Sequence, residues 1–209
     1  MAFPPHDLSL TPDEVKLVAD RDLFRAKQRI ILKVRALLTR LHQDLQDDLG
    51  GSTLLLPPEF DPGKAQFVKG EHLEECPYQY LDYPKHFVGD DKFTFRSLCW
   101  WGHHLIFAMI VEGGLVKQQK KNFFDRFHQL AGQGLELSLA PTLWEWKRGE
   151  GYTLPITHDR KAQLAAVLSG RSWFKIARFV PLDSPAMQEG RLPEVGRETF
   201  RSLLPLLTP

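Results

Sequence analysis

The segment from Lys92 to Val111 constrains the fold more than any other part of this 209-residue chain. Phe93 to Trp100 and His103 to Val111 are rich in β-branched and aromatic residues. Trp101-Gly102 between them suits a two-residue turn in which the glycine takes a positive φ. The second run is apolar on both faces, which predicts a central strand. A sheet built around this hairpin is therefore expected.

The first fifty residues predict helices. Thr11 followed by Pro12 is typical of a helix start. A longer helix is expected from Asp22 to Leu49, because its apolar residues keep the three-and-four spacing of one buried stripe. Gly50-Gly51-Ser52 would end it. The end of this helix carries acidic residues where the helix dipole disfavours anions, which predicts a basic partner for Asp44, Asp47 and Asp48.

Prolines and aromatic residues dominate residues 51–91. Three prolines disfavour regular structure between Thr53 and Gly63, and a short strand is expected at Gln66 to Val68. Cys76 to Pro84 is too aromatic for a solvated loop, and its prolines favour extended or turn conformations. We therefore expect residues 51–91 to form a wrapping loop packed against the core.

Helices and strands alternate after the hairpin. The expected helices are Gly113–Ala131, a helix ending at Ser169, and Pro193–Pro205. The expected strands are Leu135–Leu139, a strand that contains Trp144 and Trp146, the strand Tyr152–Ile156 that follows it after a turn, and Trp173–Val180. This order predicts an α+β fold, with a largely antiparallel sheet of hairpins covered by helices and a long N-terminal helix packed across it. One domain is expected over residues 1–209, with a helical segment 1–50, the wrapping loop 51–91 and a sheet-and-helix core 92–209.

The composition excludes several classes of protein. Twenty-seven basic residues against 26 acidic ones give a net charge of +1, which argues against a polybasic nucleic-acid coat. Two cysteines, Cys76 and Cys99, exclude a disulfide-stapled scaffold and a four-thiolate zinc site. The start of the chain, Met1–Asp7, has no signal-peptide pattern, and the longest apolar run is only Leu105–Val111. A soluble, cytoplasmic protein without a cofactor is expected.

One segment resembles a known family. Leu81-Asp82-Tyr83-Pro84, Phe87, Arg96 and Trp100-Trp101-Gly102 are similar to the central signature of an uncharacterised bacterial protein family with an LDYPR-type loop and a WWG turn. The chain differs from that pattern at Lys85, where arginine is usual, and at His103, where asparagine is expected. The order of elements is also similar to that of the YktB-like proteins. The resemblance supports the fold class and brings no established activity.

The strongest candidate site lies around the predicted hairpin. With a two-residue turn at Trp101-Gly102, residues whose numbers sum to 203 would face one another across the hairpin. Trp100 would then pair with His103, and Arg96 would share their face of the sheet. An arginine beside a tryptophan offers paired donors and a stacking surface for an anionic small molecule. The predicted ligand-binding residues are Asp82, Tyr83, Arg96, Trp100, Trp101 and His103. The competing interpretation is structural: Arg96 pairs with Asp82 while the tryptophans fill the core.

Three functions follow from these residues. The leading hypothesis is a small-molecule-binding or non-enzymatic globular protein, with a small anionic ligand as the candidate partner and no membrane or metal partner. The alternative is an enzyme in which His103 transfers protons and Arg96 holds an anionic substrate. The third is nucleic-acid binding through the eight basic residues between Lys16 and Arg40. The sequence leaves open whether the chain is an enzyme.

Two further clusters have weaker support. His72 and Cys76 lie four residues apart among glutamates, but Pro77 interrupts the segment, so an acidic loop is favoured over a metal site. The predicted register also makes Cys99 a cross-strand neighbour of His104, the arrangement of a thiolate–imidazole pair. The apolar residues on that face favour an inert, buried thiol instead.

Overall fold

The structure, a computed structural model, describes residues 8–51 and 53–209. Residues 1–7, on which the expectation of no signal peptide rests, and Ser52, part of the expected helix stop, lie outside the described residues. The chain divides into two units, Met1–Ala36 and Leu37–Pro209. That residues 1–209 form a single domain stays a prediction.

The first unit is helical, as predicted. It contains α1 (Pro12–Ala19) and the first part of α2 (Arg21–Gly50). Thr11 caps α1 by accepting a hydrogen bond from the Glu14 amide, and the Glu14 carboxylate accepts one from the Thr11 amide. The expectation of a continuous buried stripe is wrong in this unit, because Leu23, Phe24 and Ile30 are exposed. Across the described residues, none of the helices combines the length and apolar character that crossing a bilayer requires.

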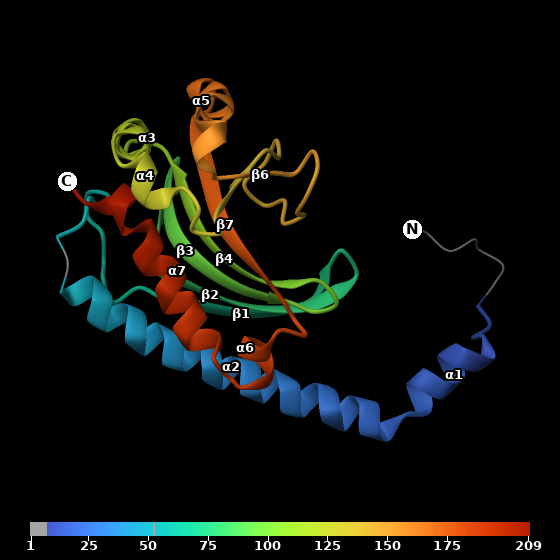
Figure 1. Ribbon diagram of the computed structural model, residues 1–209. Helices are drawn as coiled ribbons and strands as arrows, with labels where there is room; N and C mark the ends of the chain where they lie inside the picture. Colours follow the sequence, from blue (N-terminus) through green and yellow to red (C-terminus); the bar gives the residue numbers. More distant parts are fainter. Residues whose placement is uncertain (1–7, 52) are drawn as a thin grey trace. The chain divides into compact units, whose positions relative to one another are not determined.

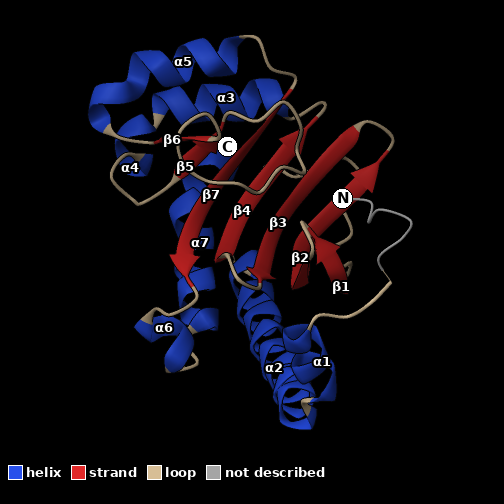
Figure 2. Cartoon of the chain, turned by 90° about the vertical axis from the view of Figure 1, so that its right-hand side faces the viewer, coloured by secondary structure: helices blue, strands red, loops and turns tan. Residues whose placement is uncertain are grey.

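The second unit is built on an antiparallel sheet, which confirms the predicted α+β class. In the described residues it has seven strands, in the order β1-β2-β3-β4-β7-β5-β6 (Figure 2). The strands are β1 (Gln66–Leu73), β2 (Cys76–Val88), β3 (Asp91–Trp100), β4 (His104–Glu112), β5 (Glu136–Ser138), β6 (Thr153–Pro155) and β7 (Trp173–Pro181). The apolar strand β4 is central, as its two-sided pattern predicted.

Helices cover one face of this sheet. They are the C-terminal part of α2 and α7 (Leu192–Leu207), which lie side by side below the strands in Figure 1. Gly196 of α7 lets them approach closely, because a Cβ atom there would lie 2.6 Å from Leu41 and 2.9 Å from Phe107 of β4. Phe95 of β3 packs against Phe107 and Phe200 on the same face. We call the other side of the sheet the open face.

The wrapping loop predicted for residues 51–91 is wrong. Residues 66–73 and 76–88 are strands β1 and β2, so the sheet begins well before residue 92. Proline removes a ladder hydrogen bond and is tolerated at strand starts and bulges. Pro77 lies at the start of β2, and Pro84, which follows a cis peptide bond, lies where the register between β2 and β3 shifts. Both prolines therefore occupy positions that a strand accepts.

The hairpin is confirmed, but its predicted register is wrong by one residue. The turn has three residues, Trp101 to His103, with Gly102 at a φ of 74°. Cys99 therefore pairs with Leu105 and not with His104. A shift of one residue moves every side chain of a strand to the opposite face. Arg96 consequently shares the open face with His104, whereas Cys99 points toward the helices.

Two other expectations are corrected. The helix expected over Gly113–Ala131 is divided at Arg126, and Trp144 and Trp146 belong to a loop between β5 and β6, not to a strand. The remaining helices are α3 (Val116–Asp125), α4 (Phe127–Leu130), the 3-10 helix η1 (His158–Arg160), α5 (Lys161–Ser169) and α6 (Pro185–Gln188).

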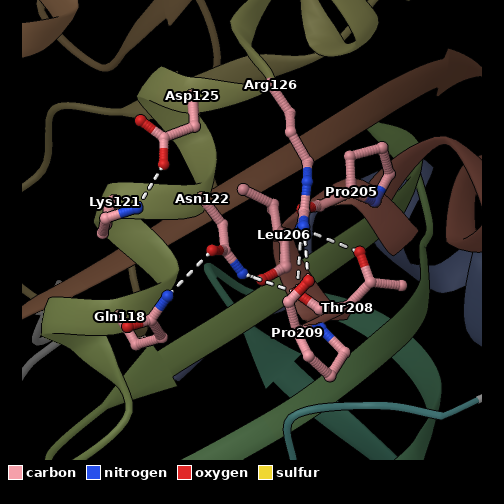
Figure 3. A network of polar contacts seen from close by, with 9 residues as sticks. All are labelled: Gln118, Lys121, Asn122, Asp125, Arg126, Pro205, Leu206, Thr208 and Pro209. Atoms are coloured by element: carbon pink, nitrogen blue, oxygen red, sulfur yellow. Dashed lines mark hydrogen bonds and ion pairs between the residues drawn. The ribbon is translucent and has the colours of Figure 1, made fainter.

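A polar network holds α3 to the end of α7 (Figure 3). Buried Asn122 donates to the carbonyls of Leu206 and Thr208 at 2.9 and 2.8 Å. Arg126 donates to the carbonyls of Pro205 and Thr208. These donors satisfy carbonyls that the end of a helix leaves without partners. The helix accordingly continues past Pro205, where the sequence predicted its end, to Leu207.

The acidic end of α2 has the basic partner that its sequence predicted. Asp48 accepts paired hydrogen bonds from Arg197 and from Arg201 of α7, at 2.7 to 3.0 Å. Burial alone would raise the pKa of Asp48, but these two arginines overcome it and lower the pKa to about 2. This contact ties residues 48 and 201, which are distant in sequence.

Replacing Asp48 should weaken the fold in a pH-dependent way. The pKa of this carboxyl is about 2 in the folded chain and 3.8 for an unperturbed aspartate, so the carboxylate stabilises the fold above pH 3.8 and loses this contribution as the pH falls toward 2. Asp48→Asn should lower the free energy of unfolding by about 2 kcal/mol at neutral pH. Urea denaturation at several pH values measures this. Asp47→Asn, at an exposed neighbour, is the matched control, and equal losses in both variants would contradict the assignment.

Candidate functional site

A cavity of about 360 Å³ lies on the open face of the sheet. Its lining is mainly aromatic and aliphatic, with one charged side chain, that of Arg96. The lining residues are Gln66, Leu73, Tyr78, Tyr80, Phe87, Arg96, Leu98, Trp144 and Trp146. We call it the aromatic cavity. The strands position most of this lining, since Tyr78 pairs with Trp100, and Tyr80 with Leu98, across β2 and β3.

Arg96 is held rigidly at the cavity. It pairs with Asp82 in the register of β2 and β3, and its Nε and Nη2 atoms donate to the two Asp82 carboxylate oxygens, each at 2.7 Å. Its guanidinium carbon lies 3.9 Å from the ring centre of Tyr80, and 5.1 and 5.4 Å from those of Trp144 and Trp146. Nη1 has no hydrogen-bond partner among the described residues. The guanidinium is therefore oriented by protein groups and keeps donors for a ligand.

The two tryptophans come from the β5–β6 loop, residues 139–152, which crosses the open face in front of the strands in Figure 2. Basic side chains hold this loop in place. Arg171 donates to the carbonyls of Ser138 and Leu139. Lys147 forms an ion pair of 2.7 Å with Glu74 in the turn between β1 and β2. Charged side chains therefore hold the loop across the cavity, where most of it forms no backbone hydrogen bonds of a β-sheet.

Lys175 of β7 supplies the deepest of these contacts. Its Nζ donates to the carbonyls of Leu143 and Glu145 and lies 4.1 Å from the ring centre of Trp146. The side chain is 2% exposed. Burial is the main cause that lowers the pKa of Lys175 to about 7; Glu145 opposes this effect and Arg96 adds to it. A buried amine below the loop therefore positions Trp146.

The structure separates the residues that the sequence grouped into one site. Arg96 lines the aromatic cavity and Asp82, fully buried, orients it. Trp100 is buried on the open face, where its indole donates to the Leu73 carbonyl at 2.9 Å. His103 stacks on Trp100, with ring centres 3.6 Å apart, and lies outside the cavity lining.

The other two predicted residues also lie away from the cavity. Tyr83 packs on the helix-covered side, where its ring lies 4.5 Å from that of His42 and its hydroxyl donates to the Pro62 carbonyl at 3.1 Å. Trp101 lies in the β3–β4 turn, and its amide donates to the Pro77 carbonyl. Burial raises the pKa of Tyr83. Tyr83 and Trp101 therefore make contacts within the protein, and neither lines the aromatic cavity.

Sequence reasoning missed the loop tryptophans and Lys175. Trp144 and Trp146 were expected on a strand, and only the tertiary contacts of their loop bring them to Arg96. Lys175 did carry a signal, because a lysine inside the apolar run Trp173 to Val180 indicates a buried cation. Tyr78, Tyr80 and Asp82 alternate along one strand, and that spacing would have grouped them had the segment been assigned as a strand.

Comparisons with known proteins find no match. No family model, no curated protein and no solved structure matches this chain. The resemblance to the family with the LDYPR-type loop stays a prediction. The assignment of the site therefore rests on its geometry.

The candidate metal and cysteine sites have no supporting geometry. Within residues 8–51 and 53–209, no group of three or more histidine, cysteine or acidic residues could hold a metal ion. Cys99 is buried, and burial raises the pKa of its thiol to about 12. Its cross-strand neighbour is Leu105, so the thiolate–imidazole hypothesis with His104 is wrong.

The two thiols should differ in reactivity. Because only the thiolate reacts, Cys99 should react slowly with iodoacetamide at neutral pH, and the partly exposed Cys76 should be labelled first. Peptide mass spectrometry of the folded protein after timed labelling measures both rates. A Cys76→Ser variant should lose the fast phase, and rapid labelling that persists in this variant would contradict the burial of Cys99.

Lys175 should make stability depend on pH in the alkaline range. Its pKa is about 7 in the folded chain against 10.5 for an unperturbed lysine, so between these values the unfolded chain binds a proton that the folded chain does not. Relative to Lys175→Met, the wild type should gain up to about 1.4 kcal/mol of stability per pH unit from pH 7 upward. Denaturation curves of both proteins across this range test it. If the difference in the free energy of unfolding between the wild type and Lys175→Met did not change with pH, Lys175 would have an ordinary pKa and the prediction would be wrong.

Proposed function

We propose that this protein binds a small planar anion in the aromatic cavity. The observation that carries the proposal is Arg96, whose guanidinium is braced by Asp82, stacked between aromatic rings and left with Nη1 free of partners. A volume of about 360 Å³ lies in the range typical of small-molecule sites, which combine apolar walls with few oriented polar groups. A carboxylate on the ligand would meet Nη1 while its ring packs against the aromatic walls.

The charges around the cavity favour an anion. Asp82 neutralises Arg96, and Glu145 lies near Lys175. Lys85 adds a further cation, since its ammonium bonds to the neutral amide of Gln66, a lining residue, at 2.7 Å. Because the pKa of Lys175 is about 7, this amine balances Glu145 only in part at neutral pH, and the charge of Lys85 makes these described groups weakly positive on balance. A negative ligand would balance that charge, whereas a positive one would add to it.

The enzyme alternative has less support. Its proton-transferring residue, His103, stacks on Trp100, four positions along β3 from Arg96, which corresponds to about 13 Å. His103 is not part of the cavity lining that contains Arg96. The nucleic-acid alternative rests on basic residues from Lys16 to Arg40 and involves none of the cavity residues. We therefore favour binding over catalysis at this site.

Paired probes of equal shape test the proposal without altering the protein. Calorimetric titration should detect saturable binding of benzoate or 2-naphthoate, and about tenfold weaker binding of the neutral amides, benzamide and 2-naphthamide. The difference arises because an amide loses the charge-assisted hydrogen bond to Arg96. Equal binding of acid and amide, or no saturable binding of either acid, would overturn the proposal.

Two tryptophan variants locate the binding. Trp144→Ala removes a half-exposed wall of the cavity and should weaken binding about five- to tenfold. Trp101→Ala removes the same side chain from the turn, outside the cavity, and should leave the affinity unchanged. Loss of binding in both variants, or in neither, would mean that the acids bind elsewhere.

A further inference from the structure

A second cavity, of about 660 Å³, lies where the glycine-rich end of the β5–β6 loop meets strands β4, β5 and β6. The aromatic cavity has one charged side chain in its lining, whereas this one has five side chains that are charged or titratable. These are His104, Glu136, Arg148, Glu150 and Arg160. None of them belongs to the lining of the aromatic cavity. The two cavities therefore differ in chemistry.

A buried carboxylate orients one arginine of this cavity. Glu136 is 7% exposed, and it accepts hydrogen bonds from Arg148 Nε at 2.8 Å and from the Thr153 hydroxyl at 2.6 Å. Arg148 Nη2 lies 2.6 Å from Glu136 Oε1, the oxygen that also accepts from Nε. Nη1 of Arg148 has no partner among the described residues. The guanidinium also lies over the ring of Phe179, 5.5 Å from its centre. Arg148 is thus fixed on two sides.

Arg160 of η1 provides a second guanidinium. It lines the same cavity and forms no side-chain hydrogen bond with a described residue, but its charge interacts with the neighbouring carboxylate of Asp159. His104 adds a third polar side chain: burial, followed by Arg148, lowers its pKa, and an imidazole can donate an N–H to an anion. Glu150, exposed at the rim, is the carboxylate that opposes an anion here.

We infer that this cavity is a binding site for a small oxyanion, a phosphate or carboxylate group, held by Arg148 and Arg160 with His104 as a further hydrogen-bond donor. An arginine braced by a carboxylate presents its remaining donors in a fixed direction, which suits the oxygens of such a group. The Glu136–Arg148 pair is neutral, so Arg160 supplies the attraction for an anion, against the opposing carboxylates of Glu150 and Asp159. The inference is independent of the aromatic cavity and its ligand.

Titration with inorganic phosphate and with acetate, at constant ionic strength and neutral pH, tests the inference. Saturable binding of either anion is expected, and the one that binds more tightly assigns the group as phosphate or carboxylate. Arg160→Gln should weaken binding about tenfold. Lys161→Gln removes the same charge from the next residue, which does not line the cavity, and should leave binding within about twofold.

A third variant should change the affinity in the opposite direction. Glu150→Gln removes the opposing charge and should strengthen binding about threefold. Because Glu150, Arg160 and Lys161 lie at or near the surface, all three variants should keep the wild-type melting temperature, which serves as the folding control. The absence of saturable binding of both anions, or equal effects of Arg160→Gln and Lys161→Gln, would overturn the inference.

Discussion

The ion pair between Arg96 and Asp82 is the interaction on which the open face depends. Both groups are buried, and two charges removed from water are tolerated only when the geometry of the pair is good. The antiparallel register of β2 and β3 supplies that geometry by placing the two residues directly opposite each other. The guanidinium then becomes the point around which Tyr80 and the loop tryptophans pack.

The β5–β6 loop turns this ion pair into part of a cavity. From residue 140 to 148 the loop forms no strand ladder, and buried Lys175 and partly buried Arg171 hold its backbone carbonyls from below. Hydrogen bonds from charged donors are stronger than neutral ones, so a few of them can fix a segment without regular structure. The same loop borders both cavities, with Trp146 on one side and Arg148 on the other. A ligand in one cavity therefore contacts the loop that lines the other.

Each cavity contains an arginine that a carboxylate orients, but the surroundings differ. Around Arg96 the neighbours are aromatic, which favours a ligand with a planar apolar part. Around Arg148 the lining carries further charged side chains, including a second arginine, Arg160, which favours a small, charged group. The contrast arises from the loop itself, since its first half carries tryptophans and its second half carries the Arg148–Gly151 turn.

The sequence by itself determined the elements whose signals are local: the capped helix at Thr11, the long helix after it, the central strand β4 and the α+β class. It also indicated a basic partner for Asp48 from the helix dipole alone. Only the tertiary structure decided the register of the β3–β4 hairpin, the strand character of the proline-containing β2 and the meeting of Trp144 with Arg96. The physical reason is range. Capping and periodicity act within a few residues, whereas a one-residue difference in a turn, a proline placed at a bulge and a loop held by buried basic side chains depend on partners far along the chain.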